Sequence, residues 1–239
     1  MNIFRTTLTI LRKELSIYFV SPLAYAFLGM FLFLAGLFFY MGLALTGEAS
    51  LRVMLGNLAI SLIFVLPMLT MRHFAEEQRA GTFELLMTSP VSLGSLIAGK
   101  WLASLTLCGV MLAGTLLFPA VLAYYGDPDW GAIFTSYVGL FLCCGAFCAA
   151  GLFASSLTDD QVAAGFFGIV ILLPFWLVGS AVTLAPEEWR PWLEMLAFLP
   201  HLSGFTKGVI DSANLAWFAS FTFIFLFLTY RTLESRRWR

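Results

Sequence analysis

Six long stretches without a charged residue constrain this chain more than any other feature of its sequence. Each stretch reaches or exceeds the roughly 17 residues that a helix needs to cross the hydrocarbon core of a bilayer. The stretches are Pro22–Gly47, Val53–Met71, Trp101–Gly126, Trp130–Thr158, Gln161–Pro186 and Ser212–Tyr230. Because a helix satisfies its backbone polar groups within one segment, the sequence predicts an all-α membrane protein with six transmembrane helices.

The composition agrees with a lipid environment. Of the 239 residues, 60% are hydrophobic and only 11% are charged, whereas soluble domains carry roughly 25% charged residues. Six spans leave no room for a sizeable soluble domain, so we expect residues 1–239 to form a single transmembrane domain. The formal net charge of −1 provides no basic field for nucleic acid, which is therefore excluded as a partner.

Residues 1–21 are predicted to form an amphipathic helix that lies at the membrane interface. Apolar residues recur there at helical spacing, and charged residues interrupt the segment too often for a span. The apolar positions are Phe4, Leu8, Leu11, Leu15 and Tyr18. A cleaved secretory signal is the competing interpretation, but no small-residue cleavage site follows.

The distribution of Lys and Arg predicts the orientation of the chain. If the N-terminus is cytoplasmic, ten basic residues lie on the inner side and three, Arg52, Arg190 and Lys207, on the outer side. This imbalance places both termini in the cytoplasm. Residues 72–100 are then the one cytoplasmic loop large enough to dock a partner. Residues 185–211, which contain three prolines and two tryptophans, are predicted to form short helices in the outer leaflet.

The predicted spans lack the groups that drive transport by themselves. None contains Asp, Glu, Lys, Arg or His, whereas ion-driven transporters and proton pumps use such groups inside the membrane. A secondary transporter is therefore disfavoured, and the energy for any transport must come from elsewhere.

One string imitates a phosphate-binding loop. Residues 94–101, GSLIAGKW, match G-x-x-x-x-G-K, but Trp101 stands where a Ser or Thr would bind Mg²⁺, and no strand precedes the string. We interpret the glycines as a helix entry, with the Lys100 side chain reaching the interface. The sequence thus predicts no ATP binding by this chain.

Other reactive side chains are few. Cys108, Cys143, Cys144 and Cys148 all lie in spans. Soft-metal ligation by Cys144 and Cys148, one helical turn apart, is conceivable, but nothing completes a site, and small apolar filler is the simpler interpretation. His73 and His201 are placed in loops on opposite membrane faces, where they cannot share a catalytic centre. No enzyme activity, cofactor or metal is therefore expected in this chain.

The cytoplasmic loop resembles a known family. Residues 76–90, EEQRAGTFELLMTSP, followed by Gly99-Lys100, resemble the loop between the second and third spans of ABC-2 type transporter permeases. Residues 13–25 also resemble that family, and residues 205–211, FTKGVID, with the segment running to Glu234, resemble its gliding-motility (GldF-like) branch in particular.

The resemblance implies a half-transporter of a bacterial inner membrane. Two such permeases, copies of one chain or similar chains, form the pathway, and each docks a separate cytoplasmic ABC ATPase that binds ATP and Mg²⁺. Residues 82–88 would be the coupling helix that enters the ATPase. The residues implied in this contact are Glu76, Glu77, Arg79, Thr82, Phe83, Glu84, Leu86 and Met87. An auxiliary protein with an extracytoplasmic domain is a possible further partner of this branch.

Three functions remain open at this point. The leading hypothesis is the membrane subunit of an ATP-driven exporter. The alternative is an anchoring or mechanotransmitting subunit, which passes ATPase work to extracytoplasmic proteins without moving a solute. A stand-alone channel or carrier is disfavoured by the large loop and the uncharged spans.

Overall fold

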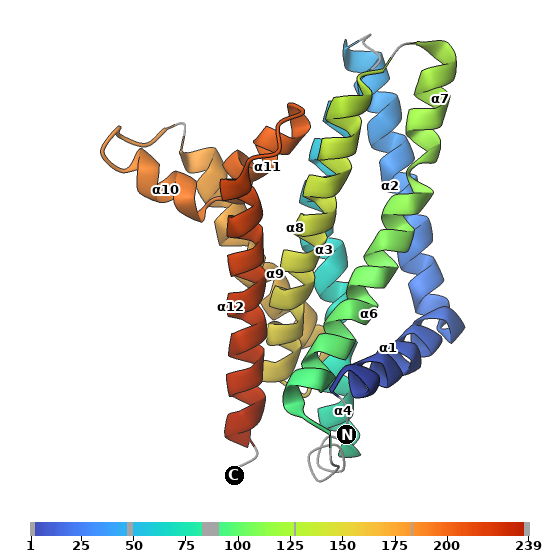
Figure 1. Cartoon of the computed structure of the whole chain (residues 1–239), viewed down its shortest axis with the longest axis vertical. Helices are drawn as coiled ribbons and strands as arrows, with labels where there is room; N and C mark the ends of the chain where they lie inside the picture. Colours follow the sequence, from blue (N-terminus) through green and yellow to red (C-terminus); the bar gives the residue numbers. More distant parts are fainter. Residues whose placement is uncertain (1–2, 47–49, 83–90, 127, 183, 237–239) are drawn as a thin grey trace.

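A computed structural model describes residues 3–46, 50–82, 91–126, 128–182 and 184–236. In these ranges the ordered elements are all helices (Figure 1). Their bounds are α1 Ile3–Val20, α2 Pro22–Thr46, α3 Arg52–Thr70, α4 Arg72–Arg79, α6 Leu93–Gly114, α7 Leu117–Tyr125, α8 Trp130–Leu157, α9 Gln161–Ala181, α10 Arg190–Leu196, α11 Phe198–Thr206 and α12 Ser212–Arg236. The prediction of an all-α fold is confirmed.

Six helical segments of the described chain are long and apolar enough to cross a membrane. They are Pro22–Leu45, Arg52–Arg79, Leu93–Tyr125, Trp130–Leu157, Gln161–Ala181 and Ser212–Arg236. The predicted count of six spans is therefore confirmed. The second and third segments include charged residues that the sequence analysis assigned to the loop, because α4 continues directly from α3 and α6 begins at Leu93.

The most buried helix, α8, lies at the centre of the bundle and packs against α3, α6, α9, α11 and α12 (Figure 1). Asp129 starts this helix because its carboxylate accepts hydrogen bonds from the backbone N–H groups of Gly131 and Ala132. α1 runs obliquely across one end of the bundle, where it packs against α6 and α2 (Figure 1). This end of the molecule holds the polar side chains described below.

The third span is interrupted between α6 and α7. Pro119 lacks a backbone N–H, so it cannot donate to the carbonyl oxygen of Thr115, its partner in a regular helix. That oxygen instead accepts from the Tyr137 hydroxyl at 3.1 Å and from the Phe118 N–H at 3.0 Å. By contrast, the chain stays helical through Pro67 and Pro174. Of the three prolines within the spans, Pro119 thus lies beside the break.

The contact between α3 and α9 leaves no room for a methyl group at Gly168. A Cβ atom there would lie 2.7 Å from the Cβ of Pro67, whose ring cannot rotate away. We therefore expect Gly168→Ala to lower the free energy of unfolding by about 2 kcal/mol. Gly165→Ala is the matched control, because its Cβ would meet the flexible Met71 side chain at 3.4 Å. Unfolding of both variants in mixed micelles measures the difference, and equal stabilities would contradict the packing.

Two short helices lie between α9 and α12, as the sequence predicted for residues 185–211. α10 projects from the bundle, whereas α11 packs against α8 and α9 (Figure 1). Phe198, Leu202 and Phe205 of α11 are buried, and the Phe198 ring makes edge contacts with Phe147 and Trp217. Aromatic packing therefore fixes α11 to the end of the bundle opposite α4.

Candidate functional site

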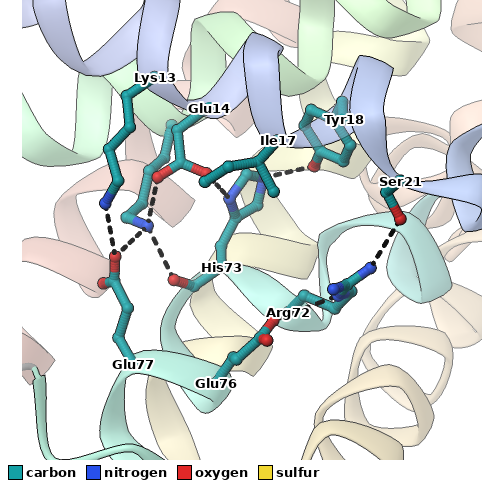
Figure 2. Close-up of a pocket in the computed structure, with 10 residues that line it drawn as sticks. Lys13, Glu14, Ile17, Tyr18, Ser21, Arg72, His73, Glu76 and Glu77 are labelled. Atoms are coloured by element: carbon teal, nitrogen blue, oxygen red, sulfur yellow. Dashed lines mark hydrogen bonds and ion pairs between the residues drawn. The ribbon is translucent and has the colours of Figure 1, made fainter.

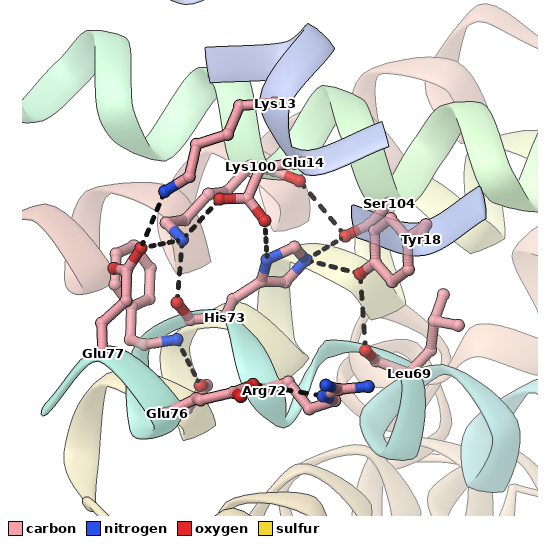
Figure 3. Close-up of polar contacts among 12 residues, drawn as sticks. Lys13, Glu14, Tyr18, Leu69, Arg72, His73, Glu76, Glu77, Lys100 and Ser104 are labelled. Atoms are coloured by element: carbon pink, nitrogen blue, oxygen red, sulfur yellow. Dashed lines mark hydrogen bonds and ion pairs between the residues drawn. The ribbon is translucent and has the colours of Figure 1, made fainter. Parts of the chain in front are cut away.

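A buried group of charged side chains lies between α1 and α4 (Figure 2). Its centre is Lys100 of α6, whose side chain is only 2% exposed. The Lys100 ammonium donates to Glu14 Oε1 of α1 at 2.9 Å, to Glu77 Oε1 of α4 at 2.8 Å and to the His73 carbonyl oxygen at 2.9 Å (Figure 3). All three ammonium protons thus have acceptors. We call Glu14, Tyr18, His73, Glu77, Lys100 and Ser104 the charged joint.

The imidazole of His73 connects the other members of the charged joint. Its Nδ1 lies 3.7 Å from Glu14 Oε2, and its Nε2 lies 2.8 Å from the Tyr18 hydroxyl and 2.6 Å from Ser104 Oγ. Burial raises the pKa of the Tyr18 hydroxyl, which therefore stays protonated. Three helices that are distant in sequence are thereby connected through side chains with little exposure to water.

The carboxyl group of Glu14 is held in its charged form. Burial by itself would raise its pKa, but the nearby His73 imidazole and the charge of Lys100 outweigh burial and lower the pKa to about 2. Since the ordinary value is 4.5, the folded chain binds this proton less tightly than the unfolded chain does. Glu14 thus stabilises the fold above about pH 4.5, and this contribution is lost as the pH falls toward 2.

We expect the stability of the chain to depend on pH through Glu14. Lowering the pH from 5 to 3 should reduce the free energy of unfolding of the wild type, whereas Glu14→Gln should be less stable at pH 5 and lose less on acidification. Replacing the exposed Glu188 by Gln provides the control for general acid effects. Parallel pH profiles for Glu14→Gln and the wild type would contradict the assignment.

The position of Lys100 corrects the interpretation made from the sequence. Its side chain does not extend to the interface; it is buried because two carboxylates and a carbonyl group converge on it. His73 is likewise buried in α4 rather than exposed in a loop. The string from Gly94 to Lys100 lies entirely within α6, so it lacks the strand-loop-helix form of a phosphate-binding loop.

A second set of contacts fixes α4 to the central helix. The Ser155 hydroxyl of α8 accepts hydrogen bonds from the backbone N–H groups of Phe74 and Ala75, at 2.9 and 3.1 Å, and donates to the Met71 carbonyl oxygen at 2.9 Å. The first N–H groups of a helix have no partner within it. Ser155 therefore caps α4 from another helix.

The far end of α4 contacts α8 and α12. Gln78 donates to the Ser156 carbonyl oxygen at 3.4 Å and accepts from Arg236, which also donates to the Leu157 carbonyl oxygen at 2.9 Å. α4 is consequently bound along its length to α1, α6, α8 and α12.

The structure places the residues that the resemblance assigned to the ATPase contact in different environments. Glu77 belongs to the charged joint, whereas Glu76 is half exposed and pairs with Arg72 at 3.2 Å. Arg79 and Thr82 are exposed at the end of α4. The remaining four lie outside the described residues; they are Phe83, Glu84, Leu86 and Met87.

Sequence reasoning missed most of the charged joint, although a signal was present. Its six members form three pairs of polar residues. The two residues of each pair are four positions apart on one helix near a membrane boundary, and residues at this spacing share a helix face. The pairs are Glu14 with Tyr18, His73 with Glu77, and Lys100 with Ser104.

The second histidine does not approach the charged joint. His201 lies in α11, at the opposite end of the bundle (Figure 1), where its Nδ1 is 2.8 Å from Asn214 Oδ1. The two histidines thus lie far apart, as the sequence predicted. All four cysteines are buried, and Cys108 Sγ lies 3.6 Å from Cys148 Sγ where α6 meets α8.

Part of the chain matches the model of a known protein family. Residues 59–230 match the family model described as ABC-2 family transporter protein. The matched segment runs from α3 into α12 and covers more than half of the chain, including four of the six residues of the charged joint. A comparison with curated proteins finds no match.

Proposed function

Because the chain belongs to the ABC-2 transporter family, we propose that it is the membrane subunit of an ATP-driven exporter whose energy comes from a separate cytoplasmic ABC ATPase. Membership identifies the chain as a multi-pass permease component rather than an ATPase. The export direction, the partner subunits and the roles of single residues belong to the proposal.

The charged joint is the observation that carries this proposal. It lies where α4 leads into the loop that the proposal assigns to the ATPase, and it connects α4 to α1 and α6. Ser155 connects the same helix to the centre of the bundle. A displacement of the loop would therefore move several spans instead of being absorbed by a flexible connection.

The proposal gives the loop residues different tasks. Glu77 transmits motion through Lys100, while Arg79, at the exposed end of α4, and Thr82 beyond it can contact the ATPase. Glu76 pairs with Arg72 instead. Residues 83–88 supply the apolar part of that contact. ATP and Mg²⁺ bind in the partner.

The assembly proposed is a pair of permeases, identical or similar, in a bacterial inner membrane with both termini in the cytoplasm. The start of α1, the end of α12 and α4 lie at one end of the bundle (Figure 1), which supports a common side for the termini and the loop. An auxiliary extracytoplasmic protein, as in the gliding-motility branch, is a further proposed partner.

The proposal predicts that Phe83→Ala weakens the complex with the proposed ABC ATPase partner. Losing an apolar anchor from a packed contact typically costs about 2 kcal/mol, which is roughly 30-fold in affinity. Titrating the ATPase onto the permease in nanodiscs measures this loss. Phe223→Ala, which removes an exposed phenylalanine from α12, is the matched control. Wild-type affinity and wild-type coupled hydrolysis in Phe83→Ala would overturn the proposed coupling role.

A further inference from the structure

A cavity of about 160 Å³ opens between α1 and α4, beside the charged joint (Figure 2). Glu14, His73 and Lys100 line its inner part, and Lys13, Ile17, Arg72 and Glu76 line its rim. A single buried water needs only ~10–15 Å³ measured in this way, and drug-sized ligands need several hundred. The cavity therefore has room for a small polar group of a few atoms.

The rim offers a cation and a carboxylate side by side. Arg72 donates from Nε to Glu76 Oε2 at 3.2 Å and from Nη1 to Ser21 Oγ at 3.3 Å. A guanidinium has five donors, and these two contacts use only two of them. The side chains of Arg72 and Glu76 are 32% and 50% exposed, so a ligand can reach both.

The charges that line the cavity balance. Three carboxylates and three basic side chains contribute, from Glu14, Glu76 and Glu77 and from Lys13, Arg72 and Lys100. A simple anion at Arg72 would approach the Glu76 carboxylate, and a simple cation at Glu76 would approach Arg72, with a repulsive cost in either case. A zwitterion, with an anionic and a cationic group a few ångströms apart, satisfies both side chains.

Apolar side chains continue from the rim toward the corner between α1 and α2. Ile17 borders the cavity and is 45% exposed, while Val20 and Leu23, on either side of Ser21 and Pro22, are 83% and 38% exposed. In a multi-pass membrane protein such a surface contacts acyl chains. Basic side chains between helices near the membrane surface are typical of lipid headgroup sites.

We infer that this cavity binds the headgroup of a zwitterionic phospholipid with a primary amine, its phosphate on Arg72 and Ser21 and its ammonium on Glu76. The phosphate accepts charge-assisted hydrogen bonds from the guanidinium and the hydroxyl. The ammonium donates to the Glu76 carboxylate, which a quaternary amine cannot match because it has no N–H. The lipid thereby fills the space between α1 and α4 from the membrane side.

The test uses the chain alone, without an ATPase, so its result is independent of the proposed export function. Native mass spectrometry of the chain should retain one phosphatidylethanolamine in preference to phosphatidylcholine. Arg72→Gln should reduce this retention at least about tenfold, or ~1.4 kcal/mol. Arg231→Gln is the matched control, because Arg231 also pairs with a glutamate on its own helix, Glu234, at 3.0 Å.

Two further measurements test whether the headgroup must belong to a lipid and whether Glu76 recognises its amine. Soluble phosphoethanolamine at the same concentration should not displace the lipid; displacement, or binding of the soluble compound alone, would overturn the lipid assignment. Glu76→Gln should bind both lipids equally, because it loses the acceptor for the ammonium. Equal retention of both lipids by the wild type would overturn the inference.

If the Arg72→Gln variant does not fold, the Glu76→Gln variant tests the headgroup site instead, because it keeps the Arg72 cation. Both variants are compared with the wild type by thermal unfolding in phosphatidylcholine, where equal midpoints show an intact fold. Wild-type selectivity in a folded Glu76→Gln variant would contradict a headgroup site at this rim.

Discussion

Lys100→Met is expected to destabilise the folded chain by about 3–5 kcal/mol, because it leaves Glu14 buried without its cation and Glu77 with only the Lys13 ammonium, 4.0 Å away. The side chains have similar length, so the loss of charge, more than the loss of volume, determines the effect. The Lys100 ammonium also donates to the His73 carbonyl oxygen, which would lose this donor. Reversible unfolding in mixed micelles at pH 7 measures the change.

Two comparisons isolate the charge as the cause. Lys207→Met removes an exposed lysine and should change stability by less than about 0.5 kcal/mol. Combining Lys100→Met with Glu14→Gln and Glu77→Gln removes the unpaired charges and should recover part of the loss. If Lys100→Met were as stable as Lys207→Met, Lys100 would be the solvated interfacial anchor that its position in the sequence suggested.

The spans could be predicted from the sequence because the bilayer imposes a local rule. A segment that crosses hydrocarbon must be long, apolar and helical whatever its neighbours are, so Trp130–Thr158 identified α8 to within one residue. The break in the third span was harder to predict from the sequence. Pro119 lies beside the break, and the Thr115 carbonyl oxygen that it leaves without a helical donor accepts from the Tyr137 hydroxyl of another helix, a contact that hydropathy does not reveal.

The charged joint could not be derived by the same rule. Lys100, placed at the end of a loop by hydropathy, is compatible with an exposed side chain or with a buried ion pair. Only the packing of α1 and α4 against α6 brings Glu14 and Glu77 to it. For the same reason Glu77, which the family resemblance implied in ATPase contact, faces the interior, whereas Glu76 beside it does not.

A buried ion network at this place favours specificity more than stability. Apolar side chains of similar volume often stabilise a fold as well as a buried ion pair does, so the net stability that the charges contribute does not explain them. Charges require particular partners at particular distances, and thus fix α4 in one position relative to α1 and α6. Such a defined position suits a helix through which a partner acts on the membrane bundle.

Ser155→Ala is expected to lower the free energy of unfolding by about 2–4 kcal/mol, because it leaves the buried N–H groups of Phe74 and Ala75 without an acceptor. Ser156→Ala is a closely matched control: both serines are 0% exposed, but the Ser156 hydroxyl bonds only the Phe153 carbonyl oxygen of its own helix. Hydrogen exchange at the Phe74 and Ala75 amides should rise in Ser155→Ala and stay slow in Ser156→Ala. If α4 transmits motion to the centre of the bundle, Ser155→Ala should also separate ATP hydrolysis from export in the reconstituted complex. Equal stability and equal exchange in the two variants would show that α4 is not held by the central helix.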